Sequence, residues 1–270
     1  MPKTAFTAIA GHVKPPRCVV ITGASSGLGA GLARSYALPG RVLALVGRNA
    51  ARLEAVAAFC RDAGAEIVTA TLDLTDGAAA QRWLEALDAA HPVDLVVANA
   101  GISAGTRPDG QLEGAVAAVA LVQANLLGVL HTVEPLLPRL LARGNGHVAV
   151  VASVAAYRGL PDSPAYCASK AGVRLYGEAL RAALAPRGVA VSVIVPGFFA
   201  SPMSQRFLGA KPFMLELDQA VARTRAGLDR RAARIVFPRR LGWLLQAADL
   251  MPARLGDRVV RAMPFRIAPE

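Results

Sequence analysis

The chain has 270 residues, of which 54% are hydrophobic and 18% charged. So much apolar material excludes a disordered chain and is enough for a large core, and the length is ordinary for one α/β domain. The formal net charge of +11 fits an anionic partner. Because the basic residues form no run with interleaved aromatic residues, we expect no nucleic-acid partner.

The three cysteines, Cys18, Cys60 and Cys167, are odd in number and widely spaced. This arrangement argues against a disulfide framework or a zinc site, and we expect no bound metal. No segment approaches the roughly 18 uninterrupted apolar residues of a membrane span. Residues 1–16 carry only a short apolar patch and predict a loose arm rather than a secretory signal, so we expect a cytoplasmic protein.

Segments rich in valine and isoleucine alternate with helical patterns along the chain. The predicted strands start at Cys18, Val42, Glu66, Asp94, His147 and Val189, and the predicted helices span 28–38, 50–63, 77–90, 112–142 and 165–185. This alternation predicts right-handed crossovers and a doubly wound parallel β-sheet in a single α/β domain. We expect ligands at the carboxyl ends of the strands, and we expect the most apolar helix, 112–142, to be buried.

The domain is expected at 17–237, with a substrate lid at about 203–229 and an appendage at 238–270. The IVF segment at 235–237 predicts a seventh, edge strand, and GWLLQAADLM at 242–251 predicts a basic amphipathic helix. Such a helix either binds an anionic membrane or covers a substrate pocket or a subunit interface. The lid offers an apolar set that either faces a hydrophobic substrate or packs as ordinary core: Phe207, Leu208, Phe213, Met214 and Leu215.

A glycine-rich turn, TGASSGLG, lies between the first predicted strand and the first predicted helix. Glycine permits a tight turn and a close approach to a phosphate, and the following helix N-terminus attracts negative charge. The turn therefore predicts a dinucleotide site formed by Gly23, Ser25, Ser26, Gly27, Leu28 and Gly29.

The residues at the end of the second predicted strand indicate which of two cofactors, NAD(H) or NADP(H), the chain prefers. An NAD site usually carries an acidic residue about 20 residues after the glycines, which holds the ribose 2′-hydroxyl. No Asp or Glu occurs between Gly29 and Glu54, whereas Arg48 stands where a guanidinium can pair with a 2′-phosphate. We therefore expect NADP(H) to be preferred over NAD(H).

Five motifs occur in a fixed order: TGASSGLG, ANAG at 98–101, Ser153, YCASK at 166–170 and PGFFASPM from Pro196. In this set the chain resembles the short-chain dehydrogenase/reductase family over residues 17–203. The resemblance implies a Rossmann fold, a nicotinamide cofactor and oxidation of an alcohol or reduction of a carbonyl.

The resemblance also implies the catalytic set Asn125, Ser153, Tyr166 and Lys170. Tyr166 corresponds to the proton donor or acceptor, Ser153 to the group that holds the substrate oxygen, and Asn125 to an anchor for a water. Lys170 corresponds to the residue that lowers the tyrosine pKa and binds the nicotinamide ribose. An ammonium one helical turn from a phenol favours the phenolate, which is the physical reason for the spacing.

The same resemblance implies further contacts to the cofactor. Asp73, with Leu74 beside it, matches the residue that contacts adenine, and Asn99, Ala100 and Gly101 match the loop beneath its ribose. Pro196, Gly197 and Ser201 match the segment around the nicotinamide. Serine at 201 replaces the family's more frequent threonine and keeps the hydroxyl, and Ala98 stands where asparagine is common.

We therefore expect an NADPH-dependent oxidoreductase that reduces a hydrophobic ketone or aldehyde, or catalyses the reverse reaction. One alternative is a reductase of 3-oxoacyl thioesters, and another is a non-catalytic NADP-binding scaffold. The family commonly forms dimers and tetramers through the helices that here span 112–142 and 165–185. We expect a homodimer or homotetramer, and the tail leaves open a location peripheral to the inner face of a membrane.

Overall fold

The computed structural model describes residues 14–105, 112–209, 211, 213–262 and 265–267. Seven strands form one parallel sheet in the order β3-β2-β1-β4-β5-β6-β8. Their bounds are Cys18–Thr22 (β1), Val42–Gly47 (β2), Glu66–Thr71 (β3), Leu95–Ala98 (β4), Gly146–Val151 (β5), Val189–Pro196 (β6) and Arg234–Phe237 (β8). The predicted doubly wound sheet is confirmed, including the seventh strand at its edge.

The burial of each strand follows its place in the sheet. β1, β4 and β5 lie inside the sheet and every one of their residues is buried. β3 lies at the edge and is largely exposed along its length. This difference arises because an edge strand has a neighbouring strand on one side only.

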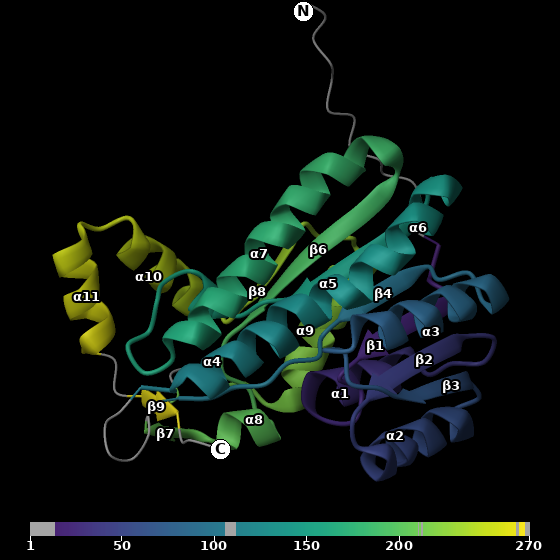
Figure 1. The fold of residues 1–270 in the computed structure, drawn as a ribbon, viewed down its shortest axis with the longest axis horizontal. Helices are drawn as coiled ribbons and strands as arrows, with labels where there is room; N and C mark the ends of the chain where they lie inside the picture. Colours follow the sequence, from purple (N-terminus) through teal and green to yellow (C-terminus); the bar gives the residue numbers. More distant parts are fainter. Residues whose placement is uncertain (1–13, 106–111, 210, 212, 263–264, 268–270) are drawn as a thin grey trace, which may run out of the picture.

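Helices cover both faces of the sheet (Figure 1). Helices α1 (Gly27–Tyr36), α2 (Ala50–Asp62) and α9 (Leu217–Asp229) pack through residues such as Leu32, Leu53 and Leu228 against one face. Helix α3 (Gly77–Ala90), the segment 115–143 and helix α7 (Pro164–Leu184) cover the other. The order of the strands reverses between β1 and β4. A crevice is expected at this point, at the carboxyl ends of the strands.

The predicted helix at 112–142 consists of five consecutive helical pieces. These are α4 (Ala115–Val122), a π-helical turn (Gln123–Leu127), α5 (Gly128–Val133), a 3₁₀ turn (Glu134–Leu136) and α6 (Leu137–Arg143). Only one face is buried, and Val116 and Val119 are 88% and 55% exposed. The expectation of a buried helix is therefore wrong for half its surface. By length and composition alone the segment could cross a membrane, a test that core helices also pass.

The C-terminal part begins beside the sheet and then leaves it. Helix α8 (Pro202–Gln205) precedes the short strand β7 (Phe207–Gly209), and β7 pairs antiparallel with β9 (Phe265–Ile267). Helices α10 (Arg239–Asp249) and α11 (Ala253–Arg261) lie between β7 and β9 in the sequence. They form a helical pair at the side of the molecule opposite α2 and β3 (Figure 1). Leu241 and Leu245 of α10 belong to the main core, so the appendage is packed onto the domain.

The predicted arm and lid are described in part. Residues 1–13 of the arm, and 210 and 212 of the lid, lie outside the described residues. The part of the lid after Leu217 is helix α9, whose Ala220, Val221 and Leu228 belong to the core under the sheet. Its role is structural. The three cysteines are buried and unpaired with one another.

Arg158 fastens the α10–α11 pair to the domain. Its guanidinium lies 2.6 Å from an Asp257 carboxylate oxygen and 3.7 Å from one of Asp249, and it donates to the Ala253 carbonyl at 3.4 Å. The side chain of Arg158 is only 15% exposed. One arginine therefore holds both acidic residues of the two helices.

Replacing Arg158 with methionine should loosen α10 and α11 while leaving the sheet folded. The charge-assisted bonds are worth roughly 1–2 kcal/mol after allowance for the half-exposed aspartates. We expect hydrogen exchange in 239–262 to accelerate about tenfold or more in Arg158→Met. Arg254→Met, which changes an exposed arginine of α11, is the control and should exchange like the wild type. Equal exchange rates in the two variants would contradict the anchoring role.

Candidate active site

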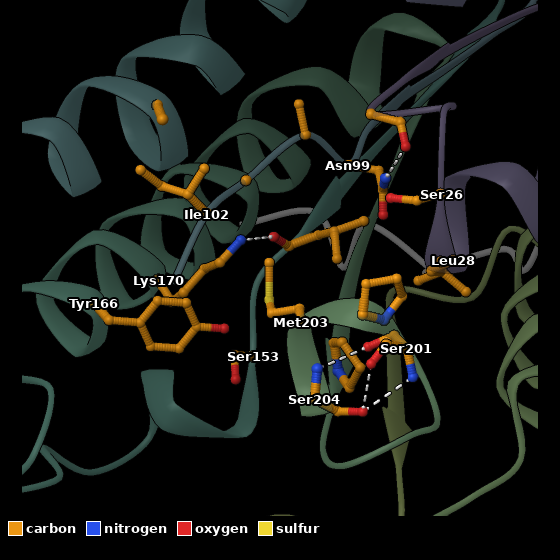
Figure 2. A pocket seen from close by; sticks show the side chains of 18 of the residues that line it. Ser26, Leu28, Asn99, Ile102, Ser153, Tyr166, Lys170, Ser201, Met203 and Ser204 are labelled. Atoms are coloured by element: carbon orange, nitrogen blue, oxygen red, sulfur yellow. Dashed lines mark hydrogen bonds between the residues drawn. The ribbon is translucent and has the colours of Figure 1, made fainter. Parts of the chain in front are cut away.

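A cavity of about 650 Å³ opens at the carboxyl ends of the strands. Most of the residues that the sequence singled out line it: Gly23, Ser25, Ser26, Gly27, Leu28, Arg48, Asp73, Leu74, Asn99, Ala100, Gly101, Ser153, Tyr166, Lys170, Pro196, Gly197 and Ser201. Figure 2 shows that they reach the cavity from several separate elements. The volume lies in the range of ordinary small-molecule sites.

Two predicted residues, Gly29 and Asn125, lie behind the cavity wall. A side-chain carbon at Gly29 would stand 2.3 Å from the Gly23 carbonyl oxygen, so this glycine lets α1 pack closely against the turn. Its contact with a cofactor stays a prediction. Asn125 is fully buried in the π-helical turn and acts through its neighbours, as described below.

The glycine turn presents the start of α1 to the cavity. Gly23 and Gly27 have φ values of 66° and 52°, a region that favours glycine. Ser26 is the N-cap of α1, and its hydroxyl makes no capping bond to the helix. The first N–H groups of the helix and this hydroxyl are therefore available to an anion, which is what a phosphate requires.

Thr22 joins this turn to the loop after β4. Its hydroxyl accepts hydrogen bonds from the backbone N–H groups of Asn99 (3.0 Å) and Ala100 (3.2 Å). The Asn99 amide in turn donates to the Thr22 carbonyl at 2.9 Å. Sequence analysis did not single out Thr22, although a threonine ending a run of apolar strand residues is a recognisable signal.

The far end of the cavity is basic. Arg48 and Arg52 both line it, and the Asn49 side chain caps α2 by accepting from the Arg52 N–H at 2.8 Å. The nearest acidic residue in sequence, Glu54, pairs with Arg61 at 2.7 Å on the exposed side of α2. Arg52 is a second cation at this end that the sequence reasoning missed.

The loop after β3 is held from two sides. Asp73 accepts from the backbone N–H and the hydroxyl of Thr75, at 3.0 and 2.9 Å, and these bonds to Thr75 lower the pKa of Asp73. His131 of α5 lies 2.8 Å from the Leu74 carbonyl through Nδ1. The sequence analysis missed this role of His131, because nothing in the sequence places it beside Leu74.

Ser153, Tyr166 and Lys170 meet at the opposite end of the cavity. Ser153 follows β5, and Tyr166 and Lys170 lie one turn apart near the start of α7. The three are 9%, 7% and 4% exposed. Figure 2 shows the Tyr166 hydroxyl directed into the cavity with Ser153 close by.

Burial controls the ionisation of the pair on α7. Desolvation raises the pKa of Tyr166 to about 12, and the hydrogen bond with Ser153 offsets only part of that rise. Desolvation lowers the pKa of Lys170 to about 8. The Lys170 ammonium donates to the Val151 carbonyl at 3.0 Å. Burial therefore dominates the pKa of Tyr166 here, and the lowering of the tyrosine pKa by Lys170 stays a prediction.

Asn125 organises the loop that passes over Lys170. Its amide oxygen accepts from the Ile102 N–H at 2.7 Å, and its NH₂ donates to the Ile102 carbonyl at 3.0 Å and to Ser169 at 3.1 Å. A side-chain carbon at Gly101 would lie 2.9 Å from the Asn125 oxygen and 3.3 Å from the Lys170 nitrogen. The side-chain amide of Asn125 therefore fixes the Gly101–Ile102 backbone, and the anchoring of a water by this residue stays a prediction.

Glu113 caps the helix that carries Tyr166 and Lys170. Its carboxylate accepts from the Ala165 N–H at 3.0 Å, and the residue is only 5% exposed. Ser163, the N-cap of α7, makes no side-chain capping bond, so Glu113 takes that place from a distant part of the chain. A negative charge at a helix N-terminus is stabilising. No local motif marks Glu113 in the sequence.

The wall beside Tyr166 and Ser153 is apolar. It is formed by Leu160, Phe198, Met203, Phe207, Leu241 and Leu245. The Phe198 and Phe207 rings pack edge to face at 5.3 Å. Of the predicted lid residues, Phe207 lines the cavity, whereas Phe213 and Met214 are 50% and 44% exposed and point elsewhere. Leu215 packs against the core below the sheet, and the side chain of Leu208 lies outside the described residues.

Comparison with known proteins places this geometry in a family. Residues 17–211 match the family model described as short chain dehydrogenase. An uncharacterized oxidoreductase of Myxococcus xanthus is 35% identical over 252 residues, which cover 92% of this chain and 97% of that protein.

Two solved structures resemble the chain over most of its length. A short-chain dehydrogenase from Sphingobium yanoikuyae in complex with NADPH is 28% identical with a TM-score of 0.73, covering 90% of this chain and 95% of that chain. A short chain dehydrogenase/reductase from Burkholderia phymatum in complex with NAD is 25% identical with a TM-score of 0.77, covering 92% and 96%.

Removing the Glu113 carboxylate should destabilise the protein through α7. A lost N-cap costs about 1–2 kcal/mol, so the free energy of unfolding in urea should fall by that amount in Glu113→Ala. Glu113→Gln keeps an acceptor for the Ala165 N–H and should lose less. If the alanine variant is as stable as the wild type, the carboxylate does not support the helix.

Proposed function

The chain belongs to the short-chain dehydrogenase family, and we propose that it uses NADPH to reduce a hydrophobic ketone or aldehyde to an alcohol, or catalyses the reverse reaction. As a member of this family the chain is an oxidoreductase of the class that interconverts alcohols and carbonyls. The observation that carries the proposal is one cavity with arginines at one end and Tyr166 with Ser153 beside an apolar wall at the other.

The residues at the turn fit a nicotinamide dinucleotide. Gly23 and Gly101 line the cavity, and a carbon added at either would come within 2.9 Å of a neighbouring protein atom and displace the backbone there. The start of α1 and the Ser26 hydroxyl would hold the pyrophosphate, and Asp73 the adenine. When bound, the nicotinamide supplies or accepts the hydride.

The preference for NADPH rests on charge. Arg48 and Arg52 would pair with a 2′-phosphate, and Glu54, which could hold an unmodified ribose, is paired with Arg61 instead. The two similar solved structures are complexes of NADPH and of NAD, so family membership alone leaves the choice open. The arginines of this chain favour the phosphorylated cofactor.

Tyr166 is suited to give a proton to a carbonyl oxygen. With a pKa of about 12 it is protonated at neutral pH, as carbonyl reduction requires. Ser153 would donate a second hydrogen bond to the same oxygen, and both bonds strengthen as the oxygen becomes negative. When Tyr166 loses its proton, the ammonium of Lys170, one helical turn away on α7, would stabilise the phenolate.

The class of substrate follows from the apolar wall. Leu160, Phe198 and Phe207 offer no charge to pair with, and they exclude water from the reacting carbonyl. A screen of NADPH oxidation across aromatic ketones, ketosteroids, long-chain keto-lipids and 3-oxoacyl thioesters separates the proposal from its alternative. Turnover confined to the thioesters would favour the alternative, and absence of turnover with every class would contradict both.

We further propose that the protein is a cytoplasmic homodimer or homotetramer. Apolar side chains on α4 and α7 support this assembly, since Val116, Val119 and Leu175 are 55% or more exposed on helices that lie beside one another. Three buried and unpaired cysteines suit a reducing compartment.

Replacing Tyr166 with phenylalanine should abolish turnover and leave NADPH binding intact. The variant loses only a hydroxyl, which general acid catalysis requires, and a loss of roughly 10²–10⁴-fold in kcat is expected. Binding is measured by the fluorescence of NADPH. Tyr176→Phe on the same helix is the matched control, because its hydroxyl bonds Glu134 outside the cavity. Normal turnover in Tyr166→Phe would disprove the mechanism.

Replacing Arg48 with aspartate should reverse the cofactor preference. The carboxylate repels a 2′-phosphate and accepts a hydrogen bond from a 2′-hydroxyl, so kcat/KM with NADPH should fall by about tenfold or more relative to NADH. Arg82→Asp, on an exposed arginine outside the cavity, controls for the change in net charge. An unchanged ratio of the two kcat/KM values would remove Arg48 from the cofactor site.

A further inference from the structure

Helix α10 has two faces with different surroundings. Leu241 and Leu245 on its inner face line the substrate end of the cavity. On its outer face, Trp243 is 73% exposed and Leu250, just after the helix, is 89% exposed. Large apolar side chains in water are unfavourable, and a group of them on one surface marks an interaction site.

Arginines surround these apolar side chains. Arg239 and Arg240 are exposed at the start of α10, and Arg254, Arg258 and Arg261 are exposed on α11. Leu244 and Leu255, each 48% exposed, complete what we call the outer surface of α10–α11. Within the described part of the chain, none of these five arginines forms an ion pair.

The two helices also carry acidic residues. Asp249 and Asp257 are half-exposed, and both lie close to Arg158, at 3.7 and 2.6 Å. Arg158 offsets one of these two negative charges, so among the described residues the five exposed arginines still give the outer surface a net positive charge. The arrangement combines exposed tryptophan and leucine with uncompensated arginine, which are the two components of an interfacial membrane-binding surface.

We propose that the outer surface of α10–α11 binds an anionic lipid membrane. Arginine guanidinium groups would pair with lipid phosphates, while Trp243, Leu250 and Leu255 enter the boundary between headgroups and acyl chains. A nucleic acid would satisfy the arginines but not the leucines, so the apolar component favours lipid. Docking brings the helix that lines the substrate cavity to the membrane surface. The inference does not depend on the proposed reaction.

Binding is tested by sedimentation of the full-length protein with vesicles. The protein should bind vesicles of mixed phosphatidylcholine and phosphatidylglycerol, bind phosphatidylcholine vesicles weakly, and be released by high salt. Arg254→Gln with Arg258→Gln should weaken partition about 30-fold, since each arginine near the surface contributes about 1 kcal/mol. Arg82→Gln with Arg187→Gln removes the same charge from exposed sites elsewhere and should change partition much less.

The fluorescence of Trp243 measures whether this side chain enters the membrane. The chain has two tryptophans, and Trp83 packs against the core. Anionic vesicles should shift the emission to shorter wavelength in the wild type and in Trp83→Phe, but not in Trp243→Phe. Point substitutions are preferable to deletion of the tail, because Leu241 and Leu245 belong to the core. Thermal unfolding of each variant verifies that it is folded.

Three results would overturn the proposal. The first is a wild-type protein that does not sediment with phosphatidylglycerol vesicles at low salt. The second is an equal loss of partition in the two double-arginine variants, which would mean attraction by net charge alone. The third is a change of oligomeric mass in Trp243→Ala without lipid, measured by sedimentation equilibrium, which would make this surface a contact between copies of the chain.

Discussion

The parallel pairing of β1, β4 and β5 is the constraint on which the site depends. Val19 pairs with Leu95, and Leu95 pairs with His147, so the three strands end at one edge of the sheet. The chain leaves that edge as the glycine turn, the Asn99 loop and the Ser153 segment, and these three arrive beside one another from distant parts of the sequence. A parallel sheet covered on both faces leaves only such edges open to a ligand.

Burial then controls the protonation of Tyr166 and Lys170 at one end of this edge. The same desolvation that keeps water from the carbonyl raises the pKa of Tyr166 to about 12 and lowers that of Lys170 to about 8. Both shifts favour neutral groups, and a neutral tyrosine is the form that gives a proton away. A deep position for Tyr166 therefore keeps the residue in the form that gives a proton to a carbonyl oxygen.

Local patterns explain how much the sequence could predict. Strands, the glycine turn and the Tyr166–Lys170 spacing depend on neighbours within a few residues, and the structure places them as expected. Glu113 and His131 act on Ala165 and Leu74, which lie 52 and 57 positions away in the chain, and no local pattern encodes such contacts. The burial that dominates the pKa of Tyr166 escapes sequence analysis for a related reason, since the spacing of Tyr166 and Lys170 shows which charge is near but not how deeply both groups are buried.

The C-terminal helices show why an amphipathic pattern is ambiguous in sequence. The pattern alone fits a membrane surface, a cover for the pocket or a subunit interface. In the structure α10 has an inner face, with Leu241 and Leu245 at the cavity, and an outer face with Trp243 exposed. A single helix with about 3.6 residues per turn can carry both surfaces. Because five exposed arginines outnumber Asp249 and Asp257, which both lie beside Arg158, the outer side stays positive, and the packing of the inner face onto the domain leaves exposed the surface proposed to meet lipid.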